Sequence, residues 1–204
     1  MKGEMNSGTT QQEDRAGKAR HQRTAPGMTI PRLTFAEQLV LWSARRLATA
    51  DHGAAATETE AAACREDARA RVAGELSVAL CPTGGPASGL EAAEALARTL
   101  GIFGSAGMRS LHLNPMCCRF VSNDERLFLS FLASCQEGDH HHAAVLLSWF
   151  LPPCAMRIAA ADGAAFAAAL LAAGFCLPQR LRVAGGAGPL RATPMEHATP
   201  PTLH

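Results

Sequence analysis

The chain has 204 residues, which suits one folded domain with flanking segments, because single hydrophobic cores are usually built from roughly 100 to 200 residues. Alanine accounts for 41 residues, whereas there are only 8 phenylalanines, 2 tryptophans and no tyrosine, so we expect closely packed helices around a thin core. Residues 31–177 contain 11 arginines, no lysine and 14 acidic residues, and this negative balance disfavours nucleic-acid binding, which needs a dense basic face.

The N-terminal 30 residues are polar, carry mixed charge and show no apolar periodicity, so we predict that residues 1–30 form a disordered tail. Met28 stands directly before the first patterned segment. We therefore hypothesise that translation starts at Met28 rather than at Met1.

Capping boxes mark three helix starts, since in such a box a hydroxyl accepts from the third helical amide and a carboxylate accepts from the cap amide. The pairs are Thr34 with Glu37, Ser88 with Glu91, and Ser122 with Glu125, and they predict helices over 35–49, 89–101 and 123–137. A further helix is predicted over 55–80, followed by a loop rich in Pro and Gly from Pro82 to Gly89.

The helix predicted over 123–137 has the clearest amphipathic pattern, and Cys135 lies on its apolar stripe, where a small thiol packs like a hydrophobic side chain. Gly138 should end this helix and Asp139 should cap the next one, over roughly 140–151. The short connection predicts an antiparallel pair of helices at the centre of the core.

Two more helices are expected after the Pro152-Pro153 pair, a short one to about residue 160 and a last one from Asp162 to Gly174. Residues 108–113 alternate weakly and are expected to be extended. The fold class is therefore all-α, a compact bundle of about five to seven short helices over residues 31–177, with a disordered tail over residues 178–204.

Thiol and imidazole side chains gather between residues 112 and 154, which hold four of the seven cysteines and four of the eight histidines. These groups bind zinc or copper, but adjacent cysteines do not easily reach one ion, and consecutive histidines on a helix diverge by about 100 degrees. A metal site therefore requires the fold to bring the candidates together. The candidate ligands are Cys117, Cys118, His112, His140, His141 and His142.

Each of these residues also has a structural interpretation. We expect no cofactor, with zinc or copper as the alternative, and we expect His140, His141 and His142 to face solvent in the first turn of a helix. Cys117 and Cys118 either pack the preceding loop onto the helices or act as an oxidisable thiol pair. Arg45 and Arg46 on the first helix, with Arg69 and Arg71 on the second, are interpreted as surface residues in ion pairs, with an anion-binding patch as the alternative.

An odd number of cysteines without regular spacing, and the lack of an apolar signal segment at the N-terminus, favour free thiols and a cytoplasmic location. The longest apolar runs are short or interrupted by proline, so we expect no transmembrane helix. No phosphate-binding loop and no Gly-x-Ser-x-Gly elbow is present, which favours a protein that is not an enzyme.

The run from Leu111 to Asp124, with Cys117-Cys118 ahead of a capped helical hairpin, resembles a family of small uncharacterised bacterial proteins. The segment Leu33-Thr34-x-x-Glu37-x-Leu39-x-Leu41-Trp42, followed by Arg45 and Arg46, resembles the same family. The likeness covers roughly residues 33–177. It implies one domain and no particular activity, because the family has no known function.

The leading functional hypothesis is a cytoplasmic helical module that binds a protein partner or itself, through exposed apolar side chains such as Trp42, Trp149 or Phe150. The second hypothesis is a thiol-based metal or redox sensor centred on Cys117 and Cys118. The third, weak binding of nucleic acid by the helical hairpin, is disfavoured by the negative charge of the domain.

Overall fold

The computed structural model describes residues 28–51 and 57–181 and confirms an all-α bundle of the expected size. The described residues contain no β-strand, and one isolated antiparallel bridge joins Thr29 to Phe120. The helices are η1 (Ile30–Arg32), α1 (Phe35–Asp51), α2 (Glu58–Ala106), α3 (Asn123–Glu137), α4 (His140–Leu147) and α5 (Pro153–Ala172).

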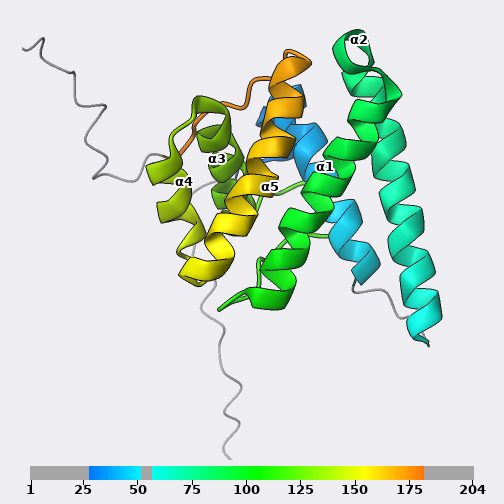
Figure 1. Cartoon of the computed structure of the whole chain (residues 1–204), viewed down its shortest axis with the longest axis horizontal. Helices are drawn as coiled ribbons and strands as arrows, with labels where there is room; N and C mark the ends of the chain where they lie inside the picture. Colours follow the sequence, from blue (N-terminus) through cyan, green and yellow to red (C-terminus); the bar gives the residue numbers. More distant parts are fainter. Residues whose placement is uncertain (1–27, 52–56, 182–204) are drawn as a thin grey trace, which may run out of the picture.

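Residues 58–106 form one element, α2, whose chain folds back on itself, so that its two arms run side by side (Figure 1). Gly89 on the second arm lies against the backbone of Ser77 on the first, where a β-carbon would collide. The predicted separate helices over 55–80 and 89–101 are thus the two arms of one element. The reversal lies at the predicted Pro- and Gly-rich loop, and no separate helix begins at Ser88.

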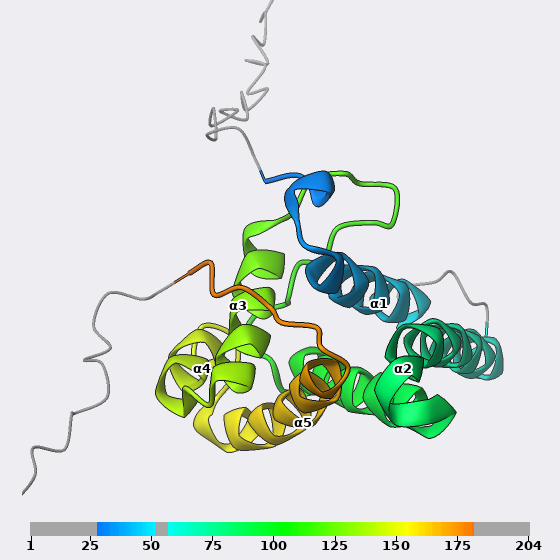
Figure 2. The same cartoon turned by 90° about the horizontal axis from the view of Figure 1, so that it is seen from above.

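The core lies where α5 packs against α2 and α3, with α1 covering α2 and α4 covering α3 (Figure 2). Phe103 of α2 stands edge-on to Phe128 of α3, with ring centroids 5.9 Å apart, and to Phe150 after α4, at 5.4 Å. Most of the remaining buried side chains are alanine and leucine. The alanine-rich composition therefore gives a core whose largest packing contacts are made by a few phenylalanines.

The predicted helix boundaries at Thr34, Ser122, Gly138 and Asp139 are confirmed. Ser122 Oγ accepts from the amide of Glu125 at 3.0 Å, and the Ser122 amide donates to the Glu125 carboxylate at 2.7 Å. Gly138 has a φ of 71°, a left-handed conformation that glycine adopts without steric cost, and Asp139 caps α4 by accepting from His142.

Helix α5 runs without a break across residue 162, so the prediction of two short helices there was wrong. Asp162 does not cap a helix but binds Arg98 of α2, with Nε 2.9 Å from Oδ1. Gly163 allows α5 to approach α3, because a β-carbon at this position would collide with the ring of Phe131. Packing against α3 thus favours a continuous helix where the local sequence suggested a new start.

Among the described residues, α5 is the one helix long and apolar enough to cross a membrane by length and composition. Its most apolar window has a mean hydropathy of 1.5 and is 33% buried within the bundle, where it packs against α2 and α3. The expectation that no helix spans a membrane stays a prediction.

Residues 28–30 and 178–181, which were assigned to the tails, belong to the described part of the chain. Residues 28–30 pair with the loop before α3, since the Ile30 amide donates to the Arg119 carbonyl at 2.9 Å and the Val121 amide donates to the Met28 carbonyl at 2.9 Å. Residues 178–181 continue the folded part of the chain. The remainder of both tails, together with the choice between Met1 and Met28 as start, lies outside the described residues.

Residues 175–180 form an extended C-terminal strap along α3. Gln136 donates to the Phe175 carbonyl at 2.9 Å and accepts from the Leu177 amide at 2.8 Å, while the Gln179 amide group donates to Ser134 Oγ at 2.7 Å. The strap ends at Arg180, whose Nη2 lies 2.8 Å from Oε2 of Glu37 at the start of α1. Side-chain contacts thus join the strap over residues 175–180 to helices α3 and α1.

The carboxyl group of Glu37 is buried, and burial by itself would raise its pKa. Hydrogen bonds from Arg180 and from the backbone and side chain of Thr34, together with the positive charge of Arg180, outweigh that effect and hold the pKa below its ordinary value of 4.5. The ionised form of Glu37 is therefore favoured by the folded state.

Replacing Glu37 with glutamine should lower the free energy of unfolding by about 1 kcal/mol at neutral pH, because it removes a charge-assisted contact whose arginine is partly exposed. A depressed folded-state pKa contributes stability above the unfolded pKa and loses it as pH falls through the folded pKa. The wild type and the Glu37→Gln variant should thus converge in stability as pH falls below about 4.5.

Urea unfolding followed by circular dichroism at several pH values measures this difference. Asp67→Asn is the matched control, since Asp67 forms an exposed pair with Arg71 and its loss should cost at most about 0.5 kcal/mol. If the stability difference between the wild type and Glu37→Gln stayed constant down to acid pH, it would contradict the lowered pKa of Glu37.

Candidate functional site

A buried ion pair between Arg45 of α1 and Glu125 of α3 is the centre of the candidate site. The Arg45 side chain is 4% exposed, and the Glu125 side chain is 0% exposed. Arg45 Nε lies 2.7 Å from Oε1 of Glu125, and Nη2 lies 2.9 Å from Oε2, so the pair is bidentate. This geometry fixes α1 against the N-terminus of α3.

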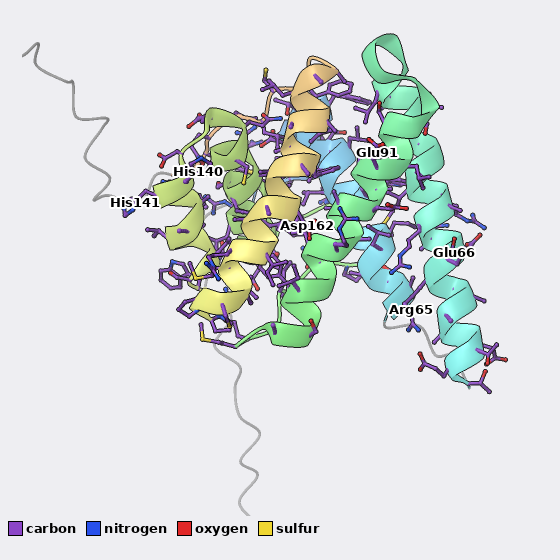
Figure 3. All side chains as sticks on the ribbon, in the orientation of Figure 1. Arg65, Glu66, Glu91, His140, His141 and Asp162 are labelled. Carbon is purple, nitrogen blue, oxygen red and sulfur yellow. The ribbon has the colours of Figure 1, made fainter. Side chains whose placement is uncertain are left out.

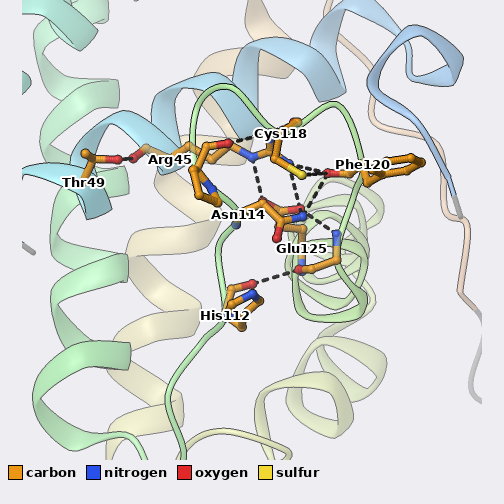
Figure 4. Close-up of polar contacts among 9 residues, drawn as sticks. Arg45, Thr49, His112, Asn114, Cys118, Phe120 and Glu125 are labelled. Atoms are coloured by element: carbon orange, nitrogen blue, oxygen red, sulfur yellow. Dashed lines mark hydrogen bonds and ion pairs between the residues drawn. The ribbon is translucent and has the colours of Figure 1, made fainter. Parts of the chain in front are cut away.

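The same guanidinium group also holds the loop that precedes α3. Arg45 Nη1 donates to the Cys118 carbonyl at 2.6 Å, and Nη2 donates to the Phe120 carbonyl at 2.8 Å (Figure 4). Within the loop, the Cys118 amide donates to the Pro115 carbonyl at 2.9 Å, which closes a turn. The loop that carries both adjacent cysteines is therefore folded around one buried arginine.

Glu125 has a second role besides its ion pair. Its Oε2 accepts from the Ser122 amide at 2.7 Å as part of the capping box, and its Oε1 accepts from the Asn114 amide at 2.9 Å. Both carboxylate oxygens thus have several donors (Figure 4). Such a complete set of partners is what makes a buried charge tolerable.

A second arginine, Arg109, anchors the start of the extended segment. It binds Asp124 through two 2.9 Å contacts, and its guanidinium carbon lies 3.9 Å above the ring centroid of Phe150. Burial would raise the pKa of Asp124, but hydrogen bonds from Arg109 and the His112 amide, with the charge of Arg109, outweigh it and lower the pKa. The extended segment is thereby fixed at both ends.

Trp42 of α1 lines three concavities of the described surface, and we call this region the Trp42 groove. One, of about 340 Å³, lies between α1 and the cysteine loop; the second, of about 440 Å³, lies toward α2; and the third, of about 290 Å³, lies toward Phe35. Phe35 is 63% exposed and Val78 is 77% exposed along the groove. The groove is lined further by Ile30, Leu39, Arg46, Glu75, Met116, Cys117 and Arg119.

The predicted metal ligands are distributed over separate parts of the fold. Cys117 is exposed and Cys118 is half-buried at the Trp42 groove, whereas His112 is exposed on the extended segment (Figure 4). His140 and His141 lie at the start of α4, far from α1 and exposed (Figure 3). Within residues 28–51 and 57–181, no three His, Cys, Asp or Glu side chains are grouped to hold a metal ion.

His142 is buried, although all three histidines of the run His140 to His142 were expected to face solvent. It is only 9% exposed, and its Nε2 atom has no hydrogen-bond partner in the described structure. The helical turn explains the difference, because successive residues diverge by about 100 degrees and the third histidine faces the core while its neighbours face solvent. The prediction that all three face solvent was therefore wrong for His142.

Arg45 is the central residue of the candidate site whose burial the sequence interpretation missed. It was grouped with Arg46 on the surface, whereas it is 3% exposed and belongs to the core. A signal was present, since Arg45 follows the apolar Leu41 by four residues and so lies on the same face of the predicted helix. An arginine at such a position requires a buried carboxylate, and only the fold identifies Glu125 as that partner.

Replacing Glu125 with glutamine should destabilise the domain by about 3 to 5 kcal/mol, because the neutral amide leaves the Arg45 charge buried without its counter-ion. The double replacement Arg45→Met with Glu125→Gln should recover part of that loss, which a double-mutant cycle by urea unfolding would measure. Arg98→Gln, at an exposed pair, is the control. Additive single effects would contradict a coupled pair.

No protein-family model, no curated protein and no solved structure matches this chain. The resemblance to a family of uncharacterised bacterial proteins therefore stays a prediction.

Proposed function

We propose that this domain is a non-enzymatic protein-interaction module that binds a segment of a partner protein in the Trp42 groove. The observation that carries the proposal is the position of Trp42 on the wall of three concavities, between α1, α2 and the cysteine loop. Tryptophan is enriched among the residues that dominate binding energy at interfaces. The exposed Phe35 and Val78 extend the apolar surface on either side.

Hydrogen bonds of Arg45 hold one wall of the Trp42 groove in place, which favours peptide binding. Arg45 lies beneath the groove and donates to five carbonyl and carboxylate oxygens, so the loop that forms one wall is fixed before a partner binds. Docking onto a preformed wall loses less conformational freedom than ordering a loop during binding.

The charges at the groove favour an acidic partner. Arg46 and Arg119 line it, and neither has a carboxylate partner among the described residues, whereas Glu75 is the single described carboxylate on its walls. Arg71 is already paired with Asp67. We therefore infer that the occupant is a peptide segment with bulky apolar anchors and flanking aspartate or glutamate residues.

A cytoplasmic location belongs to the same proposal. The six cysteines whose side chains are described are free thiols, which agrees with a reducing compartment. Self-association through the same groove is the alternative to a separate partner.

Trp42→Ala should weaken the binding of groove-directed peptides by at least tenfold, because it removes the largest apolar side chain of the surface. The probe is a random peptide library displayed on phage and selected on the immobilised full chain. Enriched peptides should combine aromatic or leucine anchors with acidic residues, and their affinities are then measured by calorimetry.

Trp149→Ala is the matched control, since Trp149 is 60% exposed and does not line the groove. Equal affinity of selected peptides for the wild type and Trp42→Ala would exclude the groove. Light scattering separates the alternatives, because a dimer that Trp42→Ala converts to a monomer would indicate self-association.

The second candidate function, thiol-based sensing, is supported by the placement of the cysteine pair. Cys117 is exposed at the groove, and the carbonyl of Cys118 is bound by Arg45. A disulfide between adjacent residues strains the local backbone, so oxidation of the two thiols would disturb the turn that forms one groove wall. Zinc or copper binding at the same pair remains an alternative prediction.

Alkylation of the native protein tests the thiol arrangement. Cys117 should react with iodoacetamide at least tenfold faster than Cys135, because burial raises the pKa of the Cys135 thiol to about 12 and keeps it protonated. Peptide mass spectrometry over time measures each site, with the exposed Cys64 as reference. Comparable rates at Cys117 and Cys135 would contradict the described exposure.

A further inference from the structure

A further concavity, of about 600 Å³, is lined by residues of α3, α4 and α5. Helices α4 and α5 lie on the side of the bundle away from α1 (Figure 2). We call it the α4–α5 cavity. Its walls are apolar and mostly small, and they include Ala143, Leu147, Met156, Ala160 and Ala164. The volume falls in the range of roughly 300 to 1,000 Å³ that is typical of small-molecule sites, which often lie between the helices of a bundle.

The space exists because α4 and α5 pack mainly on α3 and α2 and touch each other little. The alanines on their facing sides are too short to fill the gap. Cys135 of α3 contributes to the lining, and because burial raises the pKa of its thiol to about 12, it is an uncharged wall at neutral pH. The interior therefore suits a hydrocarbon chain.

Arg157 gives the cavity a positive charge. Arg157 and His140 line it, and no described aspartate or glutamate does. Arg157 has no carboxylate partner among the described residues, in contrast to Arg98 and Arg109, which bind Asp162 and Asp124. An arginine without a counter-ion beside an apolar cavity is complementary to a ligand carboxylate, which it can bind through two parallel hydrogen bonds.

The lining of the cavity favours a ligand with an apolar chain. Except for Arg157, His140 and Ser148, its residues are apolar or carry a thiol. A short polar anion would leave this apolar lining unused, whereas an acyl chain can contact it.

We propose that the α4–α5 cavity binds a fatty carboxylate, with the acyl chain between α4 and α5 and the carboxylate on the guanidinium of Arg157. This site is independent of the Trp42 groove, which lies on α1 and α2 and shares no lining residue with it.

The test uses the full chain and two probes of equal chain length, laurate and dodecanol, each competing with a dansyl-labelled fatty acid. Laurate should displace the fluorescent probe, and dodecanol should bind at least tenfold more weakly because it lacks the charge. Arg157→Gln should weaken laurate binding about tenfold and leave dodecanol unchanged, as expected for the loss of one charge-assisted contact. Arg157→Lys should retain part of the laurate affinity.

Arg69→Gln is the matched control, because Arg69 is exposed on α2 and should leave both affinities unchanged. Ala160→Phe fills the cavity and should abolish binding of both probes. If Ala160→Phe fails to fold, the Arg157→Gln variant still tests the proposal. Arg157 is exposed, so its replacement removes no packing in the core.

Several results would overturn the proposal. These are failure of laurate to bind at its solubility limit, equal affinity of laurate and dodecanol, and unchanged laurate affinity in Arg157→Gln. Cosedimentation with phosphatidylglycerol vesicles tests whether the cavity binds the acyl chains of membrane lipids rather than free fatty acids. Vesicle binding without binding of free laurate would assign this face to a membrane surface instead.

Discussion

The buried contact between Arg45 and Glu125 is the constraint on which the rest of the site depends. Removing two charges from water is costly, and their attraction offsets that cost only when the remaining polar atoms are also paired. Here Arg45 binds the carbonyls of Cys118 and Phe120, and Glu125 accepts from Asn114 and Ser122. The pair therefore fixes one relative position of α1, α3 and the loop, since a shift of any of them would leave a buried charge unpaired.

Capping boxes in this protein do more than end helices. Glu37 and Glu125 are the carboxylates of their boxes, and each also binds an arginine from a distant segment, Arg180 and Arg45 respectively. The contacts of Arg109 with Asp124 add a third such connection. In a bundle whose core is rich in alanine, apolar burial alone discriminates weakly between helix arrangements, and these directional contacts specify one.

The same composition explains the two concave surfaces. Short side chains leave space where helices diverge, as between α4 and α5, and the loop held by Arg45 leaves a groove beside Trp42. The two surfaces differ in chemistry. The Trp42 groove combines apolar side chains with the arginines Arg46 and Arg119. The α4–α5 cavity is more uniformly apolar, and its Arg157 has no carboxylate partner among the described residues.

The helical class, the capped starts at Thr34 and Ser122, and the ends at Gly138 and Gly174 could be predicted from local sequence, because they depend on local hydrogen bonding and glycine geometry. The sequence did not predict the continuity of α5 or the burial of His142, both of which depend on contacts with α3 or the core. Nor did it identify Glu125 as the partner of Arg45. These residues lie 80 positions apart, and only tertiary packing decides which buried charges meet, since pairing across such a distance leaves no local pattern.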